Sequence, residues 1–536
     1  MSQYDSIIIG SGINSLVVAA MLGKKRKKVL VLEAREQIGG LCSTIELKNG
    51  YKFNAIHDSI KWLDPRVMKT LRLEEWGLKI IKPNIVRIAL GKKGKHIIFN
   101  RDPLKTAASI ANLSNKDSVK WVEFVDYINR LSKLLEKLYT ITPPKIPKLE
   151  MSDIFSLTPM LFQLLKQGSR GIVDLLRVAP MMMNELMDEW FENELLRSAI
   201  STAGVHHLSL GPYAAGTGYN LLHQNLYSDG GFHNSLFIKG GTVELANTLK
   251  NIAESYNVEI RTNSKVKSIE VNQNICDGII LDNGEIIKTS TVVSGLDPNN
   301  TFINLVGTSN LDPNFLTQLN NIKYRGSTAR IFFILQSLPK IEGLDPDQMG
   351  TNFSICPTME SLEKASDGVK YGKISEIPYV EFNIPSILNQ DLTSDNKHIL
   401  SATVQYAPYN LRDQIWDDKS KSILEKNTVQ TIKSVIPNFS SLIESSFILS
   451  PQDIENEFGL KEGNLNHGEM TLDQFMFMRP TISSSQYSTP IKNLYICGGG
   501  THPGGGLHGA NGYNLSLIHI SEPTRPRLIS YAVFCL

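Results

Sequence analysis

The stretch Ile7-Ile8-Ile9-Gly10-Ser11-Gly12-Ile13-Asn14-Ser15 lies near the N-terminus and decides the fold. The β-branched run that ends at Ile9 is typical of a buried parallel strand. Gly10 and Gly12 allow a sharp turn and the close approach of a pyrophosphate to the backbone. A helix is expected from Ile13 onward, and its N-terminus favours anions. The stretch therefore predicts the start of a dinucleotide-binding βαβ unit.

Glu33 completes this unit, because it follows a second buried strand, Val29–Leu32. It lies 21 residues after Gly12, the spacing at which a carboxylate receives ribose hydroxyls. A site for NADP needs a cation there, so Glu33 favours FAD or NAD. A glycine turn followed by a surface glutamate is the alternative that the motif alone leaves open. The third glycine position is Ser15, which is small enough for close packing but weakens the motif.

Two further glycine-rich segments favour FAD. The segment Arg35–Leu41 (REQIGGL) contains a glycine pair that lets a loop fold back over the pyrophosphate, which NAD-only domains do not require. Near the other end, CGGGTHPGGG at Cys497–Gly506 follows the expected strand Asn493–Ile496 and leads into an expected helix. Backbone amides at such a helix start stabilise negative charge on a reduced flavin. We therefore expect one nucleotide site that is completed from both ends of the chain.

The motifs lie in three separated α/β segments. Residues 1–75, 235–305 and 461–514 are expected to form one discontinuous nucleotide-binding domain. Residues 76–234, mostly helical in pattern, and 306–460, of mixed pattern, are expected to form an inserted substrate domain. The middle segment contributes an expected helix at Thr242–Ser255, strands at Val258–Ile260, Val266–Val271, Ile279–Leu281 and Thr291–Val293, and a hairpin turn at Asp282–Gly284.

The last segment, residues 515–536, reads LSLIHISEPTRPRLISYAVFCL. It matches the translation of a transposase-based sequencing adapter followed by a flow-cell primer. A natural amphipathic tail is the alternative. We expect an adapter-derived artefact and exclude the segment from the fold. The helix that normally supports such a site would then be missing beyond Asn514.

Composition excludes several classes of protein. With 55 Lys+Arg against 53 Asp+Glu, the formal charge of +2 offers no case for a nucleic-acid partner. The five cysteines show no Cys-x-x-Cys spacing, which argues against a dithiol centre and a zinc site. No apolar run reaches the roughly 18 residues of a spanning helix, and the motif starts too early for a signal peptide. We expect a cytoplasmic protein; Lys24–Lys28 (KKRKK) is read as a solvated loop, with peripheral contact to an anionic membrane as the alternative.

With these residues in hand, the chain resembles the phytoene-desaturase-like FAD-dependent oxidoreductases, and among them the group of pyridine nucleotide-disulfide oxidoreductase domain-containing protein 2. The resemblance extends from Tyr4 to Asn514. It rests on motifs that occur in the family's order: GSGINSLVVAA, VLEAREQIGG, VVSGLDP at Val292–Pro298, YRGSTAR at Tyr324–Arg330, VQYAPY at Val404–Tyr409, Glu457–Leu460, His467–Glu469, Met478–Pro480 and LYICGGGTHPGGG. Departures are Ser15, and Asn511 and Tyr513, where proline and arginine are common.

The resemblance implies an α/β fold in which a discontinuous Rossmann-like FAD domain carries an inserted α+β substrate domain. It also implies that the backbone of Val266 meets the adenine and that the C-terminal glycines lie along the ribityl chain and flavin. The expected FAD-binding residues are Gly10, Gly12, Ile13, Asn14, Glu33, Ala34, Arg35, Gly40, Leu41, Val266, Gly499, Gly500, Gly505 and Gly506.

The expected reaction is hydride transfer from an apolar, isoprenoid-like substrate to the flavin, which needs little acid–base machinery. The sequence assigns no catalytic residue and no oligomeric state. The Met-rich stretch Met160–Met187 is read as helical core, with a substrate tunnel or a membrane contact as alternatives. His206, His207 and His223 lack metal-ligand spacing and are read as packed or surface residues; His502 is read as near the flavin or structural. A flavin amine oxidase and a non-catalytic lipid- or partner-binding protein stay open as alternatives.

Overall fold

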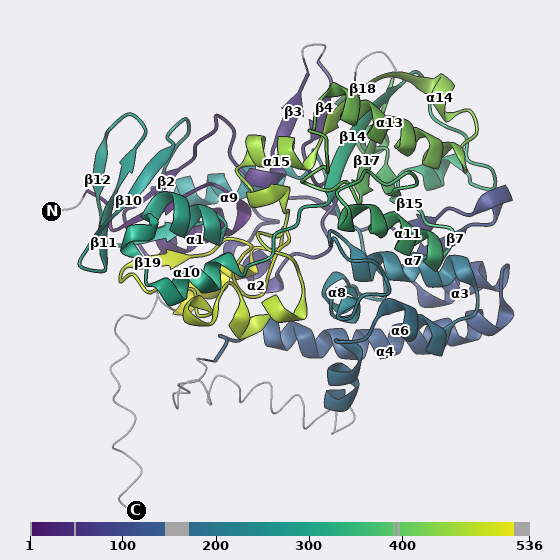
Figure 1. Cartoon of the computed structure of the whole chain (residues 1–536), viewed down its shortest axis with the longest axis horizontal. Coiled ribbons are helices and arrows are strands. Elements are labelled where there is room, and N and C mark those ends of the chain that lie inside the picture. The colour runs from purple at the N-terminus through teal and green to yellow at the C-terminus, as the bar shows by residue number, and fades with distance from the viewer. Residues whose placement is uncertain (1–2, 48–49, 145–170, 390–391, 394–396, 519–536) are drawn as a thin grey trace, which may run out of the picture.

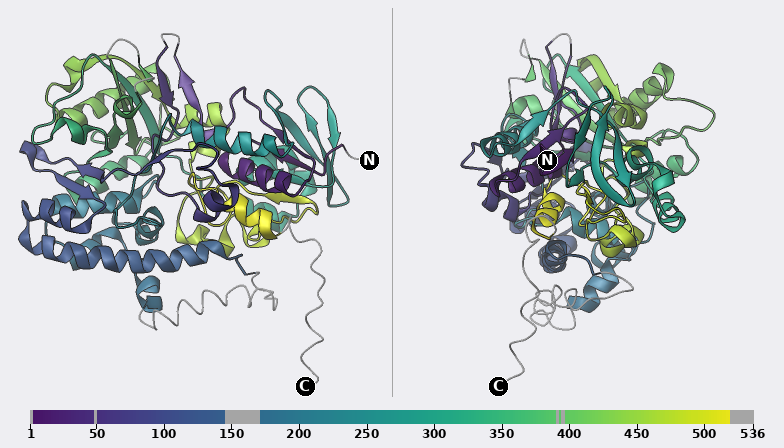
Figure 2. Two further views of the ribbon diagram at one scale, coloured as in Figure 1. Left: turned by 180° about the vertical axis from the view of Figure 1, so that it is seen from behind. Right: turned by 90° about the vertical axis from the view of Figure 1, so that its left-hand side faces the viewer.

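Two large sheets organise the protein, which we describe from a computed structural model over residues 3–47, 50–144, 171–389, 392–393 and 397–518. In Figure 1 the half that contains the N-terminus lies at the left, and the second sheet lies at the upper right above a layer of helices. The two halves are also side by side when seen from behind (Figure 2).

The first sheet has five strands in the order β19-β13-β1-β2-β9, and all of its pairings are parallel. Strands β1 (Ser6–Ile9) and β2 (Val29–Leu32) are buried at every residue, as expected for a parallel sheet covered on both faces. The other three strands are β19 (Leu494–Ile496), β13 (Val292–Ser294) and β9 (Glu259–Arg261). This sheet confirms the α/β class predicted from the sequence.

The side chains of β1 alternate between two cores. Ile8 points toward a core that contains α1 (Ile13–Lys24) and α9 (Val243–Ser255). Ile7 and Ile9 point toward the opposite core, which the three-stranded sheet covers. That antiparallel sheet consists of β10 (Val266–Asn272), β11 (Ile275–Leu281) and β12 (Ile286–Lys288). The turn at Asp282–Gly284 joins β11 to β12. The sequence analysis predicted this turn but not the short strand β12.

The second large sheet is mixed and has seven strands. Its order is β18-β14-β17-β16-β15-β6-β7, and only the pairing of β15 with β6 is parallel. The strands are β18 (Ile443–Leu449), β14 (Thr328–Leu335), β17 (His398–Gln405), β16 (Tyr379–Asn383), β15 (Phe353–Ile355), β6 (Ile85–Ala89) and β7 (Ile97–Asn100). They come from both regions that the sequence assigns to the substrate domain.

Helices cover this sheet on two sides. One group packs through Leu424 and Ile432 of α13 (Asp418–Lys433) against strand residues such as Phe333. The other group forms the layer below the sheet in Figure 1. It contains α3 (Pro103–Ala111), α4 (Asn115–Thr140), α6 (Met183–Trp190), α7 (Glu194–Val205) and α8 (Thr217–Gln224).

The remaining described α-helices and β-strands have 2 to 12 residues. They are β3 (Thr44–Glu46), β4 (Lys52–Asn54), α2 (Pro65–Leu71), β5 (Ile80–Ile81), β8 (Phe237–Ile238), α10 (Pro313–Asn320), α11 (Met359–Lys370), α12 (Pro385–Leu388), α14 (Phe439–Leu442), α15 (Pro451–Phe458) and α16 (Ala510–Ile518). Within the described ranges, every helix is too short or too polar to cross a bilayer.

The Met-rich stretch lies partly outside the described residues, which omit 145–170. In its described part, Met183 and Met187 of α6 are fully buried in the core of the helical layer. This part of the stretch is therefore core, in agreement with the sequence reading.

Candidate functional site: a nucleotide groove that opens into a histidine cavity

The N-terminal glycine turn lies at the carboxyl end of β1. Gly10 has a φ of +85°, a left-handed conformation that glycine adopts without strain. A side chain at Gly12 would meet no atom within 4 Å, so the space above this residue is open. No side chain caps α1, which begins at the next residue. An anion can therefore approach the start of this helix closely.

Glu33 is held by the glycine turn itself. Its Oε2 accepts hydrogen bonds from the backbone nitrogen of Ser11 at 3.0 Å and from the Ser11 hydroxyl at 2.5 Å. Its Oε1 accepts from the backbone nitrogen of Arg35 at 3.0 Å. The side chain thus has a fixed position at the end of β2. The carboxylate oxygens can still accept a hydrogen bond from a ribose hydroxyl.

The glycine pair after β2 crosses directly over the turn. A side chain at Gly39 would come within 2.7 Å of Ala246 on α9, and one at Gly40 within 3.3 Å of the Gly12 Cα. Gly39 and Gly40 also have positive φ values of 100° and 57°. The pair is needed because the loop lies directly on the turn and on α9.

These segments line one groove of about 670 Å³ at the carboxyl edge of the parallel sheet. The groove contains Glu33 at the end of β2 and Gly499 after β19. In the strand order these two ends are three strands apart, about 14 Å at the usual strand spacing. The groove therefore joins the two glycine-rich ends of the chain.

Twelve of the fourteen expected cofactor residues line this groove: Gly10, Gly12, Ile13, Asn14, Glu33, Ala34, Arg35, Gly40, Leu41, Val266, Gly499 and Gly506. Two residues of the prediction lie elsewhere. Gly505 lines the neighbouring cavity described below. Gly500 packs against the Pro298 ring, which an added Cβ would approach to 2.6 Å. Gly500 therefore serves packing rather than the wall of the groove.

Ser15 fits at the third glycine position because a glycine lies opposite to it. A side chain at Gly295, which follows β13, would lie 2.0 Å from the Ser15 hydroxyl. The close approach between helix and strand is thus provided by Gly295. This residue belongs to one of the family motifs, but its role was missed at the level of sequence. The signal was a glycine directly after a buried strand.

The C-terminal glycines pack against the segment 464–470. A side chain at Gly505 would come within 2.3 Å of Asn466, and one at Gly504 within 2.5 Å of Met470. Arg479, which is 2% exposed, ties both segments together. Its guanidinium donates to the carbonyl oxygens of Gly499, Asn466, Gly468 and Glu469 at 3.0, 2.7, 3.0 and 3.0 Å.

Helix α16 supports the glycine cluster, and it includes four residues of the segment 515–536 that the sequence analysis excluded from the fold. It begins at Ala510 and continues through Asn514 to Ile518. The Asn511 side-chain amide reaches the Thr501 carbonyl at 2.9 Å. Leu515 is fully buried in the core that contains α1. Residues 515–518 therefore belong to the folded structure, whatever their origin. Positions 519–536 lie outside the described residues.

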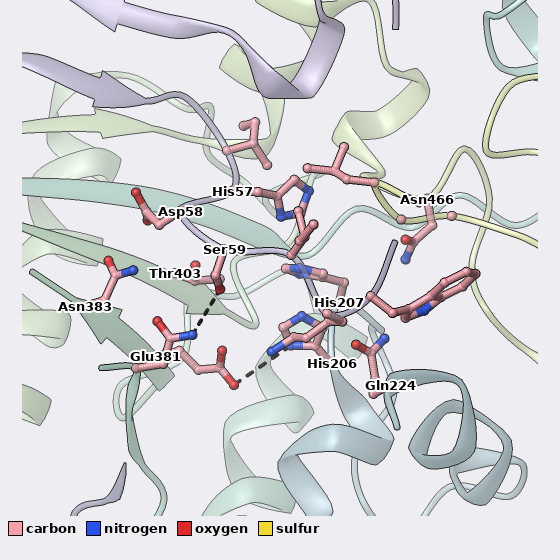
Figure 3. Close-up of a pocket in the computed structure, with 18 of the residues that line it drawn as sticks. His57, Asp58, Ser59, His206, His207, Gln224, Glu381, Asn383, Thr403 and Asn466 are labelled. Carbon is pink, nitrogen blue, oxygen red and sulfur yellow. Dashed lines mark hydrogen bonds and ion pairs between the residues drawn. The ribbon is translucent and has the colours of Figure 1, made fainter. Parts of the chain in front are cut away.

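A second cavity, of about 90 Å³, adjoins the groove, and His57, Gly506 and Leu507 line both. We call it the histidine cavity, because its walls include His57, His206, His207, His223 and His508. Figure 3 shows His206 and His207 near His57, with Glu381 to their left and joined to His206 by a dashed line. His206 and His223 are buried, which agrees with the packed reading of the sequence analysis; that they share one cavity with His57 was not predicted, since the fold brings distant segments together.

Burial sets the protonation of the cavity. It lowers the pKa of His57 and His206, and of His233 next to His206, well below the usual value, and that of His207 to about 4. These imidazoles are neutral near pH 7. Burial, with Arg87 as a further cause, lowers the pKa of the Lys61 ammonium to about 7. Glu381 is the exception, because Arg87 outweighs its burial and holds its pKa well below the usual range.

Two buried ion pairs border the histidine cavity. Arg330 on β14 donates to Asp58 at 2.6 Å and to Ser401 at 2.5 Å. Arg87 on β6 donates to Glu381 on β16 at 2.5 Å. Each charge is therefore compensated within the protein, as buried charges require.

His206, His233 and Glu381 form a group whose potential ligand atoms lie within 4.8 Å of one another. Both ring nitrogens of His233 are buried without a hydrogen-bond partner. No metal was expected from the sequence, and His233 was not among its candidates. A cation here would lie beside Arg87 and Lys61, which act electrostatically on all three residues. The surrounding positive charge thus disfavours a metal ion.

Two other expectations concern single residues. His502 lines neither cavity; its Nε2 lies 3.1 Å from the Leu138 carbonyl, and its ring packs edge-on against Tyr139. The sequence analysis left two roles open for His502, near the flavin or structural, and these contacts favour the structural one. Among the described residues, Cys42, Cys276, Cys356 and Cys497 are free and buried. The structure thus pairs none of these four thiols.

Comparisons with known proteins agree with this architecture. Residues 8–67 match the NAD(P)-binding Rossmann-like domain. The chain is 29% identical to pyridine nucleotide-disulfide oxidoreductase domain-containing protein 2 of Rattus norvegicus, over 96% of this chain and 93% of that protein. It is 24% identical to a phytoene desaturase of Fusarium fujikuroi, over 94% and 86%.

Among solved structures, the fold is similar to an oxidoreductase from Methanosarcina mazei, with a TM-score of 0.59 and 16% identity over 96% of this chain and 99% of that one. It is also similar to a putrescine oxidase variant, with a TM-score of 0.56 and 14% identity over 96% and 97%. The resemblance to phytoene-desaturase-like oxidoreductases and the two-domain fold class are thereby confirmed.

Proposed function

We propose that this chain, an oxidoreductase of the phytoene-desaturase type, binds FAD in the groove and takes a hydride from a substrate in the histidine cavity. The observation that carries the proposal is the continuity of the two spaces. The groove runs from Glu33 to the C-terminal glycines, and His57, Gly506 and Leu507 line both it and the cavity. One nucleotide can therefore have its ribose at Glu33 and its reactive ring at the cavity.

The residues of the groove have separate tasks in this proposal. The turn at Gly10 and Gly12 and the start of α1 bind the pyrophosphate. Glu33 binds a ribose, and the backbone at Val266 meets the adenine. Gly499 and Gly506 line the part of the groove next to the histidine cavity. When bound, the flavin accepts the hydride.

The division into domains follows from the same assignment. We assign residues 1–75, 235–305 and 461–514 to the FAD domain, and residues 76–234 and 306–460 to the substrate domain. The strands of the first sheet all come from the former segments, and those of the seven-stranded sheet all come from the latter.

Two alternatives to this function make different demands, one on the groove and the other on the substrate. A non-catalytic carrier has no use for a pyrophosphate turn that is closed by Gly39 and Gly40. A flavin amine oxidase must admit an ammonium group, and the cations around the histidine cavity oppose this. An isoprenoid-like apolar substrate stays a prediction; the names of two relatives, a phytoene desaturase and a limonene dehydrogenase, support it.

The test is the identity of the bound nucleotide. The purified protein should be yellow, should bleach on reduction with dithionite, and should release FAD on denaturation when the extract is compared with FAD and NAD standards. A folded, colourless protein that takes up no FAD on reconstitution would overturn the proposal. Amine-dependent release of peroxide would instead favour the amine oxidase.

A further inference from the structure

Lys61 brings to the histidine cavity an amino group that no carboxylate of the described residues accepts a hydrogen bond from. The two ion pairs, Arg330 with Asp58 and Arg87 with Glu381, cancel within the protein. Lys61 lines the cavity and forms no hydrogen bond or ion pair with any residue that the structure describes. The carboxylate that acts electrostatically on it is Glu381, which Arg87 and the Tyr379 hydroxyl already use. The ammonium group of Lys61 therefore lacks a partner.

The cavity is also small. Its volume is about 90 Å³, against about 670 Å³ for the groove, so the part of a substrate that enters it is small compared with a nucleotide. Its polar walls include the side chains of His57, Ser59 and Asn383; the Asn352 amide, also in the wall, already donates to Ser59 and Ser235 at 3.1 and 2.6 Å. Figure 3 shows His57 and Ser59 on the segment that follows β4, on one side of this space. Imidazole, hydroxyl and amide groups can donate hydrogen bonds to an oxygen anion.

We propose that the substrate carries a carboxylate close to its reacting carbon, and that this carboxylate binds in the histidine cavity against Lys61. The inference rests on the FAD-dependent oxidation proposed above and specifies its substrate class. A carboxylate compensates the one free charge of the cavity. A hydrocarbon end would leave Lys61 desolvated without a partner, which is unfavourable. An ammonium group or a metal ion would add positive charge beside Lys61 and Arg87.

The test uses the FAD-loaded protein and three probes of equal chain length: octanoate, octanol and octylamine. Binding is followed by the flavin absorbance and by the tryptophan fluorescence, because Trp62 lines the cavity. Octanoate should bind at least tenfold more tightly than either of the other two. Equal binding of octanol and octanoate, or preferred binding of octylamine, would overturn the proposal.

Variants assign the preference to Lys61. Lys61→Met should lower the affinity for octanoate at least tenfold and leave that for octanol unchanged, whereas Lys61→Arg should retain most of the octanoate affinity. Lys69→Met removes an exposed lysine on α2 and is the matched control. An unchanged octanoate affinity in Lys61→Met would exclude Lys61 as the partner. If this variant does not fold, the probe comparison in the unchanged protein still decides the substrate class.

The flavin content of the same samples separates the two proposals. A colourless protein that still prefers octanoate would contradict FAD binding but retain the anion site. A yellow protein that does not distinguish the three probes would retain FAD binding and contradict the anion site.

Discussion

The guanidinium of Arg479 donates two hydrogen bonds to the carbonyl oxygen of Gly499, from Nη2 at 3.0 Å and from Nε at 3.3 Å. Its other bonds reach the carbonyl oxygens of Asn466, Gly468, Glu469 and Gln474. Arg479 forms no ion pair within the described ranges, and burial lowers its pKa. A buried cation thus joins the C-terminal wall of the groove to the neighbouring loop through backbone oxygens alone.

Arg479→Lys should therefore weaken FAD binding although the charge is kept. Lysine has three donors around one atom and cannot reproduce a planar set of five. Each buried carbonyl left without a partner costs about 1–3 kcal/mol. We expect a lower melting temperature and at least a tenfold higher Kd for FAD, measured by thermal unfolding and by flavin titration. Arg412→Lys, at an exposed arginine, is the control; equal behaviour of the two variants would contradict this role.

Gly295→Ala should destabilise the nucleotide-binding half through Ser15. The new methyl group would lie 2.0 Å from the Ser15 hydroxyl, and overpacking of this kind costs about 1–3 kcal/mol. Ser15→Gly alone should cost less, at most about 1 kcal/mol, because Ser15 lies in the first turn of α1 and glycine lowers helix stability only moderately.

The double variant Gly295→Ala with Ser15→Gly should recover most of the stability that Gly295→Ala loses. The coupling is measured as a double-mutant cycle of unfolding free energies. Strict additivity of the two changes would show that the close contact is absent in solution.

The nucleotide half of the fold could be predicted from the sequence because its signals are local. The strand before Gly10, the acid at Glu33 and the glycine pair are each read from a few neighbouring residues. The histidine cavity could not be predicted in this way. His57, His206 and Glu381 come from three different segments, and only the packing of the seven-stranded sheet against α7 and the loop after β4 brings them together. The pairing of Ser15 with Gly295 is likewise a tertiary contact.

Glu33→Gln should reduce the affinity for FAD at least tenfold. The carboxylate now accepts from Ser11 with one oxygen and from Arg35 with the other. An amide has only one accepting oxygen, so one of these groups would face an NH₂ group. Flavin retention on gel filtration and a titration with FAD measure the loss. Glu36→Gln changes an exposed glutamate three residues away and should have no effect.

Octanoate binding should depend on pH through Lys61, whose pKa is about 7 in the free protein. Below this pH the ammonium form is already present. Above it, Lys61 must take up a proton when the anion binds, so the affinity should fall by up to tenfold per pH unit. The groups around it are Arg87 on β6, Glu381 on β16 and the neutral His206 and His233, which stay in one form in this range.

Calorimetry in two buffers of different ionisation enthalpy should detect this proton uptake at pH 8. Lys61→Met should abolish both the uptake and the pH dependence between pH 6 and 8. A flat profile in the unchanged protein would contradict Lys61 as the titrating group.

Leu515→Ala tests whether the residues after Asn514 contribute to the fold. Leu515 is 0% exposed and packs in the core around α1, whereas Leu517 on the same helix is 41% exposed. Removal of a buried leucine side chain costs about 2–5 kcal/mol, and an exposed one costs far less. Leu515→Ala should therefore lower the melting temperature and the flavin content, because α16 carries Asn511 against the glycine cluster. Leu517→Ala should do neither. If both variants melt at the temperature of the unchanged protein, the burial of Leu515 does not contribute to stability.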